Sequence, residues 1–340
     1  MARAIIMGGT GVIGRAVVAR LLHAGWEVDI GARTPSGMPP ELRGAGASFT
    51  RFDRTDAAGV ARLLSHGADL LVDCLAFTRD DVRRVLPHLD GIGASVMLSS
   101  KAVYVDAEGR HRNSEVGPYF PAPIREDNPV MAPGDGDYRT PEGYGSNKVA
   151  AEEAYLGSGH HATVIRASKV HGVGALPARE WHVVRRILDD RRAILLRSPA
   201  AIDHTSAAAN IAALVEVVAA RPGTRVLNCA DPDTPTVAGI CRTIAERLGH
   251  RLREERLPPT APEDLGRTPW DAPSPIVLDL TAAGELGYEP VGRYAATVGP
   301  TVDWLVAEAR ARGIASVQPT DFFDGLFDYA AEDRFLVERR

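Results

Sequence analysis

A tyrosine and a lysine, Tyr144 and Lys148, stand four residues apart at the start of a predicted helix. This spacing puts both side chains on one face of the helix, about one turn apart. A phenol with its usual pKa of about 10 transfers protons poorly near neutral pH unless a neighbouring cation favours the charged form. We therefore expect Tyr144 to transfer a proton and Lys148 to lower its pKa. The alternative is a surface tyrosine and lysine on an ordinary helix.

Two serines, Ser99 and Ser100, end an apolar run at residues 96–98 that is typical of a strand. Side chains at the carboxyl end of a parallel strand meet the ligand crevice of the sheet. Either hydroxyl can therefore hydrogen-bond a substrate carbonyl. The alternative is a serine that caps a turn or a helix.

The segment GGTGVIG, residues 8–14, follows an apolar run at 4–7 and precedes a helical pattern at 12–22. Strand, glycine turn and helix follow each other in this order in dinucleotide-binding folds. The glycines permit a tight turn and let the backbone approach a pyrophosphate at the helix N-terminus. The pattern predicts a nucleotide site rather than a merely structural turn. The candidate cofactor residues of the turn are Gly8, Thr10, Gly11, Val12, Ile13 and Gly14.

Apolar strand-like runs alternate with helical segments along the first half of the chain. The runs are residues 27–31, 49–52, 70–75, 96–100 and 163–166. This alternation predicts the α/β class, with a Rossmann-like doubly wound parallel sheet and a smaller C-terminal substrate-binding lobe. We expect the dinucleotide-binding domain to span residues 1–171, with 205–230 rejoining it. The substrate-binding lobe and the C-terminal tail then comprise residues 172–204 and 231–340.

The second half of the chain continues with helices and strands of its own. Periodicity predicts helices at 181–188, 210–220, 236–248 and 297–312, and strands at 193–197, 226–229 and 276–280. Between residues 105 and 140 many Pro, Gly and Asp residues interrupt any period. A segment of that length is either disordered or a functional lid.

The composition excludes several classes of partner. The 340 residues carry a net charge of −5, which argues against a nucleic-acid surface. The chain has no apolar stretch near the roughly 20 residues that span a bilayer, so we expect no membrane insertion and a cytoplasmic location. Cys74, Cys229 and Cys241 lack CxxC spacing and are interpreted as buried free thiols, not as a metal site. The oligomeric state, a homodimer included, stays open.

With these residues assembled, the chain resembles the extended short-chain dehydrogenase/reductase family, the group that includes sugar-nucleotide epimerases and dehydratases. The resemblance runs from residue 3 to about 306. It rests on GGTGVIG, LSSKAVY at 98–104, PIRE at 123–126, YGSNK at 144–148 and VLDLTAAGELGY at 277–288.

The family places its catalytic hydroxyl four residues before the tyrosine of a VY pair, which here selects Ser100 over Ser99. The resemblance implies that Tyr144 donates or accepts the proton and that Ser100 orients the oxygen. It also implies that Lys148 holds the nicotinamide ribose while lowering the tyrosine pKa. Tyr138, in the long loop, is the second and weaker candidate for the proton donor.

The chain departs from the family pattern at four positions. Dehydratases carry an Asp-Glu pair where this chain has Lys101 and Ala102, so sugar dehydration is not expected. Epimerases that grip a nucleotide diphosphate carry asparagine and arginine where this chain has Lys169 and Ala200. These replacements argue against a nucleotide-sugar substrate, although Lys169 can still meet an anion.

The end of the second strand indicates the cofactor. Family members that use NAD carry an acidic residue there, which accepts hydrogen bonds from the ribose 2′-hydroxyl. This chain has Ala32 followed by Arg33, and a guanidinium binds a 2′-phosphate as a charge-assisted fork. We therefore expect NADPH; the alternative is that Arg33 is a solvated loop charge. Asp53 matches a family position near the adenine, and Leu75 and Ala76 match positions near the pyrophosphate.

The leading hypothesis is an NADPH-dependent ketoreductase that acts on a small carbonyl substrate, sugar-like or of another secondary-metabolite type. Acidic residues in the loop and in the aromatic-rich C-terminal tail suggest a cationic amino sugar, and the chain resembles antibiotic-type reductases, including those of aminoglycoside pathways. The tail alternatively forms an ordinary amphipathic helix. Two rival functions are a sugar epimerase that retains NAD(P) and a non-catalytic nucleotide-sensing protein of the same fold.

Overall fold

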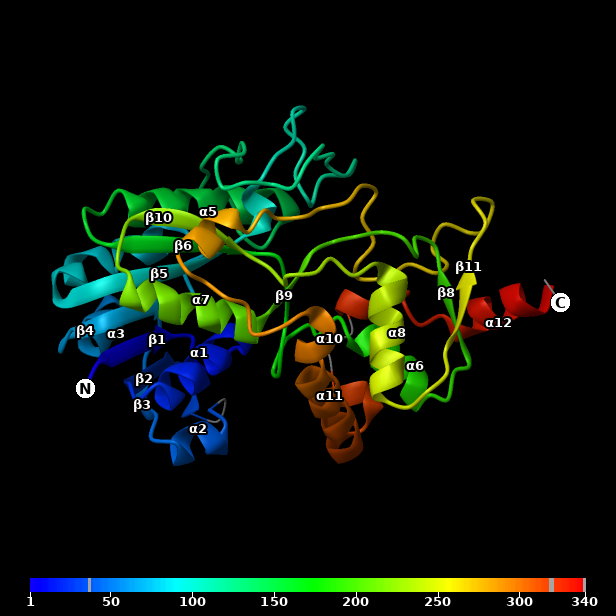
Figure 1. Cartoon of the computed structure of the whole chain (residues 1–340), viewed down its shortest axis with the longest axis horizontal. Coiled ribbons are helices and arrows are strands. Elements are labelled where there is room, and N and C mark those ends of the chain that lie inside the picture. The colour runs from blue at the N-terminus through cyan, green and yellow to red at the C-terminus, as the bar shows by residue number, and fades with distance from the viewer. Residues whose placement is uncertain (36–37, 318–320, 339–340) are drawn as a thin grey trace.

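The computed structural model describes residues 1–35, 38–317 and 321–338. A seven-stranded sheet fills one part of the molecule, and a smaller, mostly helical part lies beside it (Figure 1). The strand order is β10-β6-β5-β4-β1-β2-β3, and all neighbouring strands are parallel. The seven strands are β1 (Arg3–Met7), β2 (Glu27–Ala32), β3 (Ser48–Arg51), β4 (Ala68–Asp73), β5 (Ile92–Ser100), β6 (Ala162–Ala167) and β10 (Arg225–Cys229).

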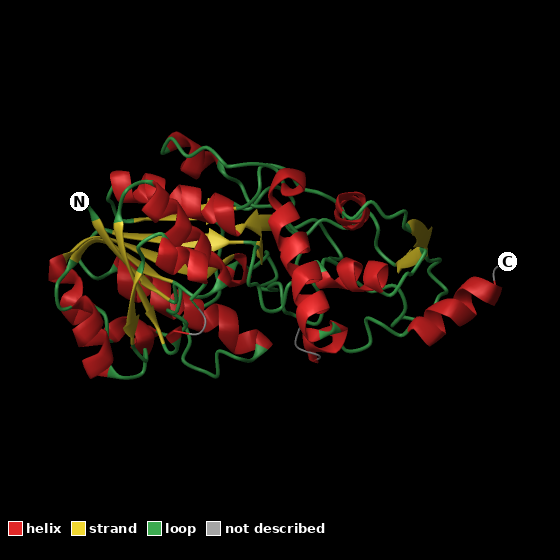
Figure 2. Cartoon of the chain, turned by 90° about the horizontal axis from the view of Figure 1, so that it is seen from below, coloured by secondary structure: helices red, strands yellow, loops and turns green. Residues whose placement is uncertain are grey.

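Helices cover both faces of the sheet, as Figure 2 shows. The inner strand β1 is therefore buried on both sides, and its residues 4–7, AIIM, are a continuous apolar run instead of an alternating one. One face packs against α1 (Val12–His23), α2 (Pro40–Gly44), α7 (Ala208–Ala220) and α9 (Thr281–Glu285). The other face packs against α3 (Ala57–Leu64), α4 (Arg79–Arg83), the 3₁₀ helix η2 (Leu86–Gly91) and α5 (Pro141–Leu156).

The strand order reverses at β1, which lies between β2 and β4. Loops that leave β1 and β4 at their carboxyl ends run to opposite sides of the sheet and leave a crevice, where ligands bind in doubly wound folds. The structure thus confirms the predicted Rossmann-like parallel sheet.

The smaller part has its own apolar core, centred on the fully buried side chain of Trp270. Its helices are α6 (Trp181–Leu188), α8 (Val237–Arg247), α10 (Tyr294–Thr297) and α11 (Gly299–Arg312), and its strands β8 (Ala193–Leu196) and β11 (Arg253–Arg256) form a two-stranded sheet. The described residues also include three short 3₁₀ helices, η3 (Lys101–Val103), η4 (Ile314–Ser316) and η5 (Asp321–Phe323), and a last helix, α12 (Tyr329–Glu338). The domain boundaries given above stay predictions.

Two segments differ from the simplest sequence interpretation. Residues 276–280 do not form the predicted strand; Ile276 and Leu278 each make only an isolated bridge, to Asp203 and Ile124. Their partners lie in loops, so no ladder extends from either bridge. Residues 169–171 and 205–207 form an unpredicted parallel pair, β7 (Lys169–His171) and β9 (Thr205–Ala207), beside the main sheet.

All three cysteines are free thiols, as expected. Cys229 and Cys241 are buried, whereas Cys74 is only half-buried and borders the cavity described below. Burial raises the pKa of the Cys74 thiol to about 12, so this side chain is a poor nucleophile near neutral pH. Among the described residues, none of the helices is both long and apolar enough to cross a membrane.

The turn between β1 and α1 leaves no room for a side chain at Gly14. A Cβ atom there would lie 2.3 Å from the carbonyl oxygen of Gly8 and 2.6 Å from the Cα of Gly9. These are backbone atoms, so strand and helix would have to separate. We expect Gly14→Ala to lower the free energy of unfolding by about 1–3 kcal/mol and to weaken dinucleotide binding.

Gly44, at the end of α2, is the matched control because nothing lies within 4 Å of a Cβ at that position. Gly44→Ala is expected to change stability by less than about 1 kcal/mol. Urea unfolding of both variants checks the expectation. Equal effects of the two substitutions would contradict the close contact at Gly14.

Candidate active site

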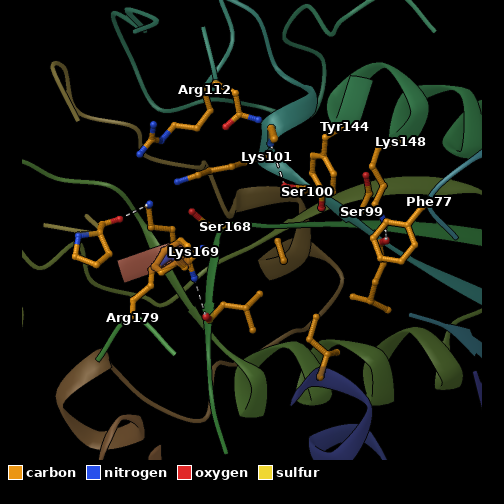
Figure 3. Close-up of a pocket in the computed structure, with 18 of the residues that line it drawn as sticks. Phe77, Ser99, Ser100, Lys101, Arg112, Tyr144, Lys148, Ser168, Lys169 and Arg179 are labelled. Atoms are coloured by element: carbon orange, nitrogen blue, oxygen red, sulfur yellow. Dashed lines mark hydrogen bonds between the residues drawn. The ribbon is translucent and has the colours of Figure 1, made fainter. Parts of the chain in front are cut away.

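A cavity of 660 Å³ opens at the carboxyl ends of the central strands. It brings together the three residues that the sequence singled out for chemistry, Ser100, Tyr144 and Lys148 (Figure 3). Ile13 of the glycine turn borders the same space. The other polar and aromatic lining residues include Phe77, Ser99, Lys101, Arg112, Asn113, Ser168, Lys169, Arg179, Arg267, Thr268, Phe322 and Asp324.

Helix α5 carries Tyr144 into this cavity. Its first turn is capped by Thr140, whose hydroxyl accepts a hydrogen bond from the Gly143 amide at 3.0 Å, and Pro141 is pre-set for the helix start. A Cβ at Gly145 would lie only 2.6 Å from the Ala102 carbonyl oxygen. The missing side chain therefore lets α5 approach the end of β5, which puts Tyr144 beside Ser100.

The two serines at the end of β5 point to different environments. The Ser99 hydroxyl donates to the buried carboxylate of Glu152, which also accepts a hydrogen bond from Arg166 at 2.7 Å. The Ser100 hydroxyl accepts a hydrogen bond from the Ala102 amide at 3.1 Å and lies near enough to the Tyr144 phenol to affect its pKa. Ser100 is therefore the serine that lies with Tyr144, and Ser99 belongs to a structural network.

Burial raises the pKa of Tyr144 above its usual value. The hydrogen bond from Ser100 and the positive charge of Arg179 oppose this rise. Lys148 is not among the groups that shift this pKa, so its expected effect on the tyrosine stays a prediction. The phenol stays protonated near neutral pH, which is the form that donates a proton.

The Lys148 ammonium faces backbone oxygens instead of the phenol. It donates hydrogen bonds to the carbonyls of Ala76 and Leu98, at 2.8 Å and 2.9 Å, and lies 4.3 Å from the centre of the Phe77 ring. Burial lowers its pKa to about 8, against the charge of Asp73. These carbonyls lie at and just beyond the ends of β5 and β4, and the expected contact of Lys148 with the nicotinamide ribose stays a prediction.

Tyr138, the second candidate proton donor, stacks on Phe77 with 5.2 Å between the ring centres. It borders a shallower neighbouring hollow together with Tyr144, whereas the main cavity is lined by Tyr144 and not by Tyr138. The geometry therefore favours Tyr144.

The glycine turn fits a dinucleotide. Gly8 has φ +82°, a conformation that side chains rarely adopt, and its amide donates to Gly31 at 2.8 Å. Helix α1 begins after Gly11 without a side-chain cap, so its first amides point toward a ligand with no competing acceptor. The backbone of residues 8–14 would hold the pyrophosphate.

The other proposed cofactor residues lie around the same edge of the sheet. Ala32 ends β2, and Arg33 is exposed directly after it. Asp53 is close enough for the charge of Arg33 to help lower its pKa, after the hydrogen bonds from Thr55. Leu75 is half-buried and Ala76 is buried just after β4, and Ala76 presents its carbonyl to Lys148.

Sequence reasoning missed most of the substrate side of the cavity. Arg112 comes from the 105–140 loop, Arg179 from the segment before α6, and Arg267 from the Pro-rich connection. No local pattern relates these arginines, because only the folded chain brings their segments together. Loop 105–140 has no regular helix or strand, but it is tied down by Asp106, whose carboxylate accepts hydrogen bonds from the amides of Glu108, Arg110 and Tyr119.

The acidic residues of the loop were expected to face a cationic amino sugar, but the loop carboxylates do not line the cavity. Asp127, Asp135 and Asp137 are not among the residues that line the cavity, and the Glu126 carboxylate accepts a hydrogen bond from the Asn228 amide instead. The C-terminal segment contributes one carboxylate, Asp324, together with Phe322 and Leu326. Its Glu332 is buried in α12 and pairs with Arg186 at 2.6 Å. A cationic amino sugar therefore meets a cavity whose charged lining residues are mainly cations.

The lowered pKa of Lys148 predicts a pH dependence of stability. Folding lowers the pKa from 10.5 to about 8, so between these values the unfolded chain holds more protons than the folded one. The contribution of Lys148 to the free energy of unfolding therefore rises with pH in this window. We expect wild type to gain up to about 3 kcal/mol relative to Lys148→Met between about pH 7.5 and 10.5.

Denaturant unfolding of both proteins across this pH range measures the difference between their free energies of unfolding. Other titrating groups are common to both proteins, so their contributions cancel in this difference. A constant difference would contradict the buried ammonium. Arg62→Met, on the exposed side of α3, is the control and is expected to show no such slope.

Proteins of known structure share this arrangement of strands and helices. No curated protein matches the chain. The dTDP-glucose 4,6-dehydratase of Bacillus anthracis, solved with NAD, superposes with a TM-score of 0.67 at 14% identity, covering 91% of this chain and 98% of that one. The UDP-glucose 4-epimerase of Thermotoga maritima, solved with UDP-glucose, gives 0.67 at 18% identity, with 90% and 99% covered.

A mutant UDP-glucuronic acid 4-epimerase of Bacillus cereus, solved with NAD and a fluorinated UDP-sugar, gives a TM-score of 0.66 at 14% identity, with 89% and 98% covered. At these identities the likeness concerns the fold. The sequence itself matches one family over residues 4–198, more than half of the 340 residues. The protein therefore belongs to the NAD dependent epimerase/dehydratase family.

Proposed function

We propose that the protein is an NADPH-dependent ketoreductase that reduces the carbonyl of a sugar-like or other secondary-metabolite substrate. Membership of the family supports a nicotinamide cofactor, and the three solved neighbours named above act on nucleotide sugars. The observation that carries the proposal is the position of Tyr144 beside Ser100 and Lys148 in one cavity, which Ile13 of the glycine turn also borders.

The reduction adds a hydride to the carbonyl carbon and a proton to the carbonyl oxygen, which yields an alcohol. The bound nicotinamide supplies the hydride. Tyr144 donates the proton as general acid, and its raised pKa keeps that proton available near neutral pH. Ser100 orients the carbonyl oxygen through its hydroxyl.

Lys148 acts as a positioning residue in this proposal. Its ammonium is already fixed by the carbonyls of Ala76 and Leu98, at the ends of the two strands that border the crevice. A third donor hydrogen stays available to a ribose hydroxyl there, because an ammonium has three. The lysine then holds the cofactor next to Tyr144.

The 2′-phosphate of NADPH is assigned to Arg33. The guanidinium is exposed after β2, and Ala32 offers the NAD ribose no carboxylate. Asp53 lies nearby and carries a negative charge, so Arg33 offsets its repulsion toward a phosphate.

A sugar epimerase that retains its cofactor is the second candidate, because two of the neighbours are epimerases. An epimerase must first oxidise its substrate, which requires Tyr144 as a base and hence as a phenolate. Stoichiometric consumption of NADPH with a ketone substrate supports the reductase, and turnover without net consumption by protein that retains NAD(P) after purification supports the epimerase.

Arg33→Ala tests the cofactor assignment. We expect wild type to bind NADPH more tightly than NADH and the variant to lose about 1.5–3 kcal/mol of NADPH binding, the usual value of a hydrogen bond to a charged group. NADH affinity should not change. Fluorescence titration measures all four dissociation constants, with Arg62→Ala as the control. Equal affinity of wild type for both cofactors would remove the assignment.

Tyr144→Phe tests the proton donor. The variant keeps its cofactor affinity, because the ring is retained, but its kcat is expected to fall by about 10²–10⁴-fold. Tyr138→Phe is the matched control and should retain most activity. A larger loss of kcat in Tyr138→Phe than in Tyr144→Phe would instead indicate that Tyr138, in the loop, is the proton donor.

The two serines are expected to respond differently. Ser100→Ala slows the chemical step, whereas Ser99→Ala leaves the buried Glu152 carboxylate with one donor fewer and lowers stability. Steady-state kinetics and urea unfolding of both variants separate these effects. A larger loss of kcat in Ser99→Ala would show that the family register selects the wrong serine.

A further inference from the structure

Four cationic side chains gather on one side of the catalytic pair. Figure 3 shows Lys101, Arg112, Lys169 and Arg179 on the opposite side of Ser100 and Tyr144 from Lys148 and Phe77. They come from η3, the loop that follows it, β7 and the segment before α6, so two remote stretches of chain, 101–112 and 169–179, converge here. All four line the cavity.

A single buried carboxylate, Asp203, pairs with three of these cations. It contacts the Lys101 ammonium, the Arg112 guanidinium at 2.9 Å and the Lys169 ammonium at 3.2 Å. The Asp203 side chain is fully buried, and the exposed fractions of the Lys101 and Lys169 side chains are 5% and 11%. One negative charge cannot balance three positive ones, and buried excess charge is costly.

Arg179 adds a fourth positive charge without joining that carboxylate. Its Nε is buried and has no hydrogen-bond partner among the described residues, while its Nη1 donates to the Val170 carbonyl at 3.4 Å. Burial, then the charges of Arg179, Arg112 and Lys101, lowers the pKa of Lys169. The cluster therefore has both excess charge and an unused donor.

We propose that this cluster binds an oxyanion of the substrate itself, a carboxylate or a phosphate ester on the carbon skeleton that carries the reacting carbonyl. The proposal rests on the proposed function and names its substrate class. Lys101 follows Ser100 directly in the chain, so an anion at the cluster lies on the same side of the cavity as the carbonyl-orienting hydroxyl. Arg112 and Arg179 supply the planar forks that suit carboxylate and phosphate oxygens.

The acidic residues near the cluster do not cancel its charge. Asp271 is occupied by the amide and hydroxyl of Thr268, and burial raises its pKa. Asp324 lies at the C-terminal edge of the cavity. Glu180 lies near Arg179 and favours its charge, so a neutral or cationic substrate would leave four cations facing two carboxylates, Asp203 and Glu180.

The test uses the protein saturated with NADP⁺, so that a probe anion cannot occupy the cofactor phosphate sites. Inorganic phosphate and acetate are titrated by calorimetry at constant ionic strength, and methylammonium is the cationic control probe. We expect saturable binding of one or both anions and none of methylammonium. Phosphate binding alone indicates a phosphate ester, and acetate binding alone indicates a carboxylate.

Two substitutions should weaken that binding. Arg112→Gln and Lys169→Gln each remove one charged donor, so the dissociation constant should rise by about 10–100-fold. Arg125→Gln is the matched control, because that arginine is 63% exposed, pairs with Asp127 and lies outside the cavity lining. Its dissociation constant should equal that of wild type.

Asp203→Asn provides a test of opposite sign. It removes the one shared carboxylate, so the anion should bind more tightly if the variant folds. Absence of anion binding by wild type, or binding that Arg112→Gln and Lys169→Gln both leave unchanged, would overturn the proposal.

Tyr144→Phe separates this proposal from the proposed function. The variant should bind the probe anions as wild type does, because the phenol hydroxyl is not part of the cluster. If Tyr144→Phe binds the anions and keeps full turnover, the oxyanion site is supported and Tyr144 is not the acid. If Tyr144→Phe loses turnover and wild type binds no anion, the reductase is supported and the oxyanion site is contradicted.

Discussion

The docking of α5 on the ends of β5 and β6 is the constraint on which the site depends. Gly145, Lys148 and Glu152 follow at spacings of three and four, so they share one helix face. Gly145 permits close contact with Ala102, Lys148 binds the carbonyls of Ala76 and Leu98, and Glu152 binds Ser99 and Arg166. Tyr144 lies at the N-terminal end of this helix face. The contacts of Gly145, Lys148 and Glu152 therefore fix its position.

The features that could be predicted from the sequence are those that depend on short segments of the chain. The turn at Gly14 requires a glycine for steric reasons, and its position between a strand and a helix is visible in the local pattern. Tyr144 and Lys148 are recognisable because four residues make one helical turn. Ser100 was separable from Ser99 only through the resemblance, and the structure gives the physical reason, since Ser99 is held by Glu152.

What could not be predicted depends on charge summed over remote segments. Periodicity reports burial of a face, but it does not report that Arg112 and Arg179 meet across the cavity. Burial likewise decides the direction of the Tyr144 pKa shift, because desolvation of the phenol outweighs the effects of Ser100 and of the Arg179 charge. The apolar run at 276–280 resembles a strand in sequence, yet its neighbours are loops that offer only single bridges.

Arg179 connects the two halves of the site. Its positive charge lowers the pKa of Tyr144, against the larger effect of burial, and it belongs to the cationic cluster as well. An anion bound at the cluster would offset part of that charge, so the tyrosine pKa would rise further when substrate binds. The phenol would then keep its proton until charge develops on the carbonyl oxygen during reduction, which is when a general acid is needed. Under the proposed function, the excess positive charge beside Ser100 and Tyr144 would thus give substrate binding a direct electrostatic effect on the acid.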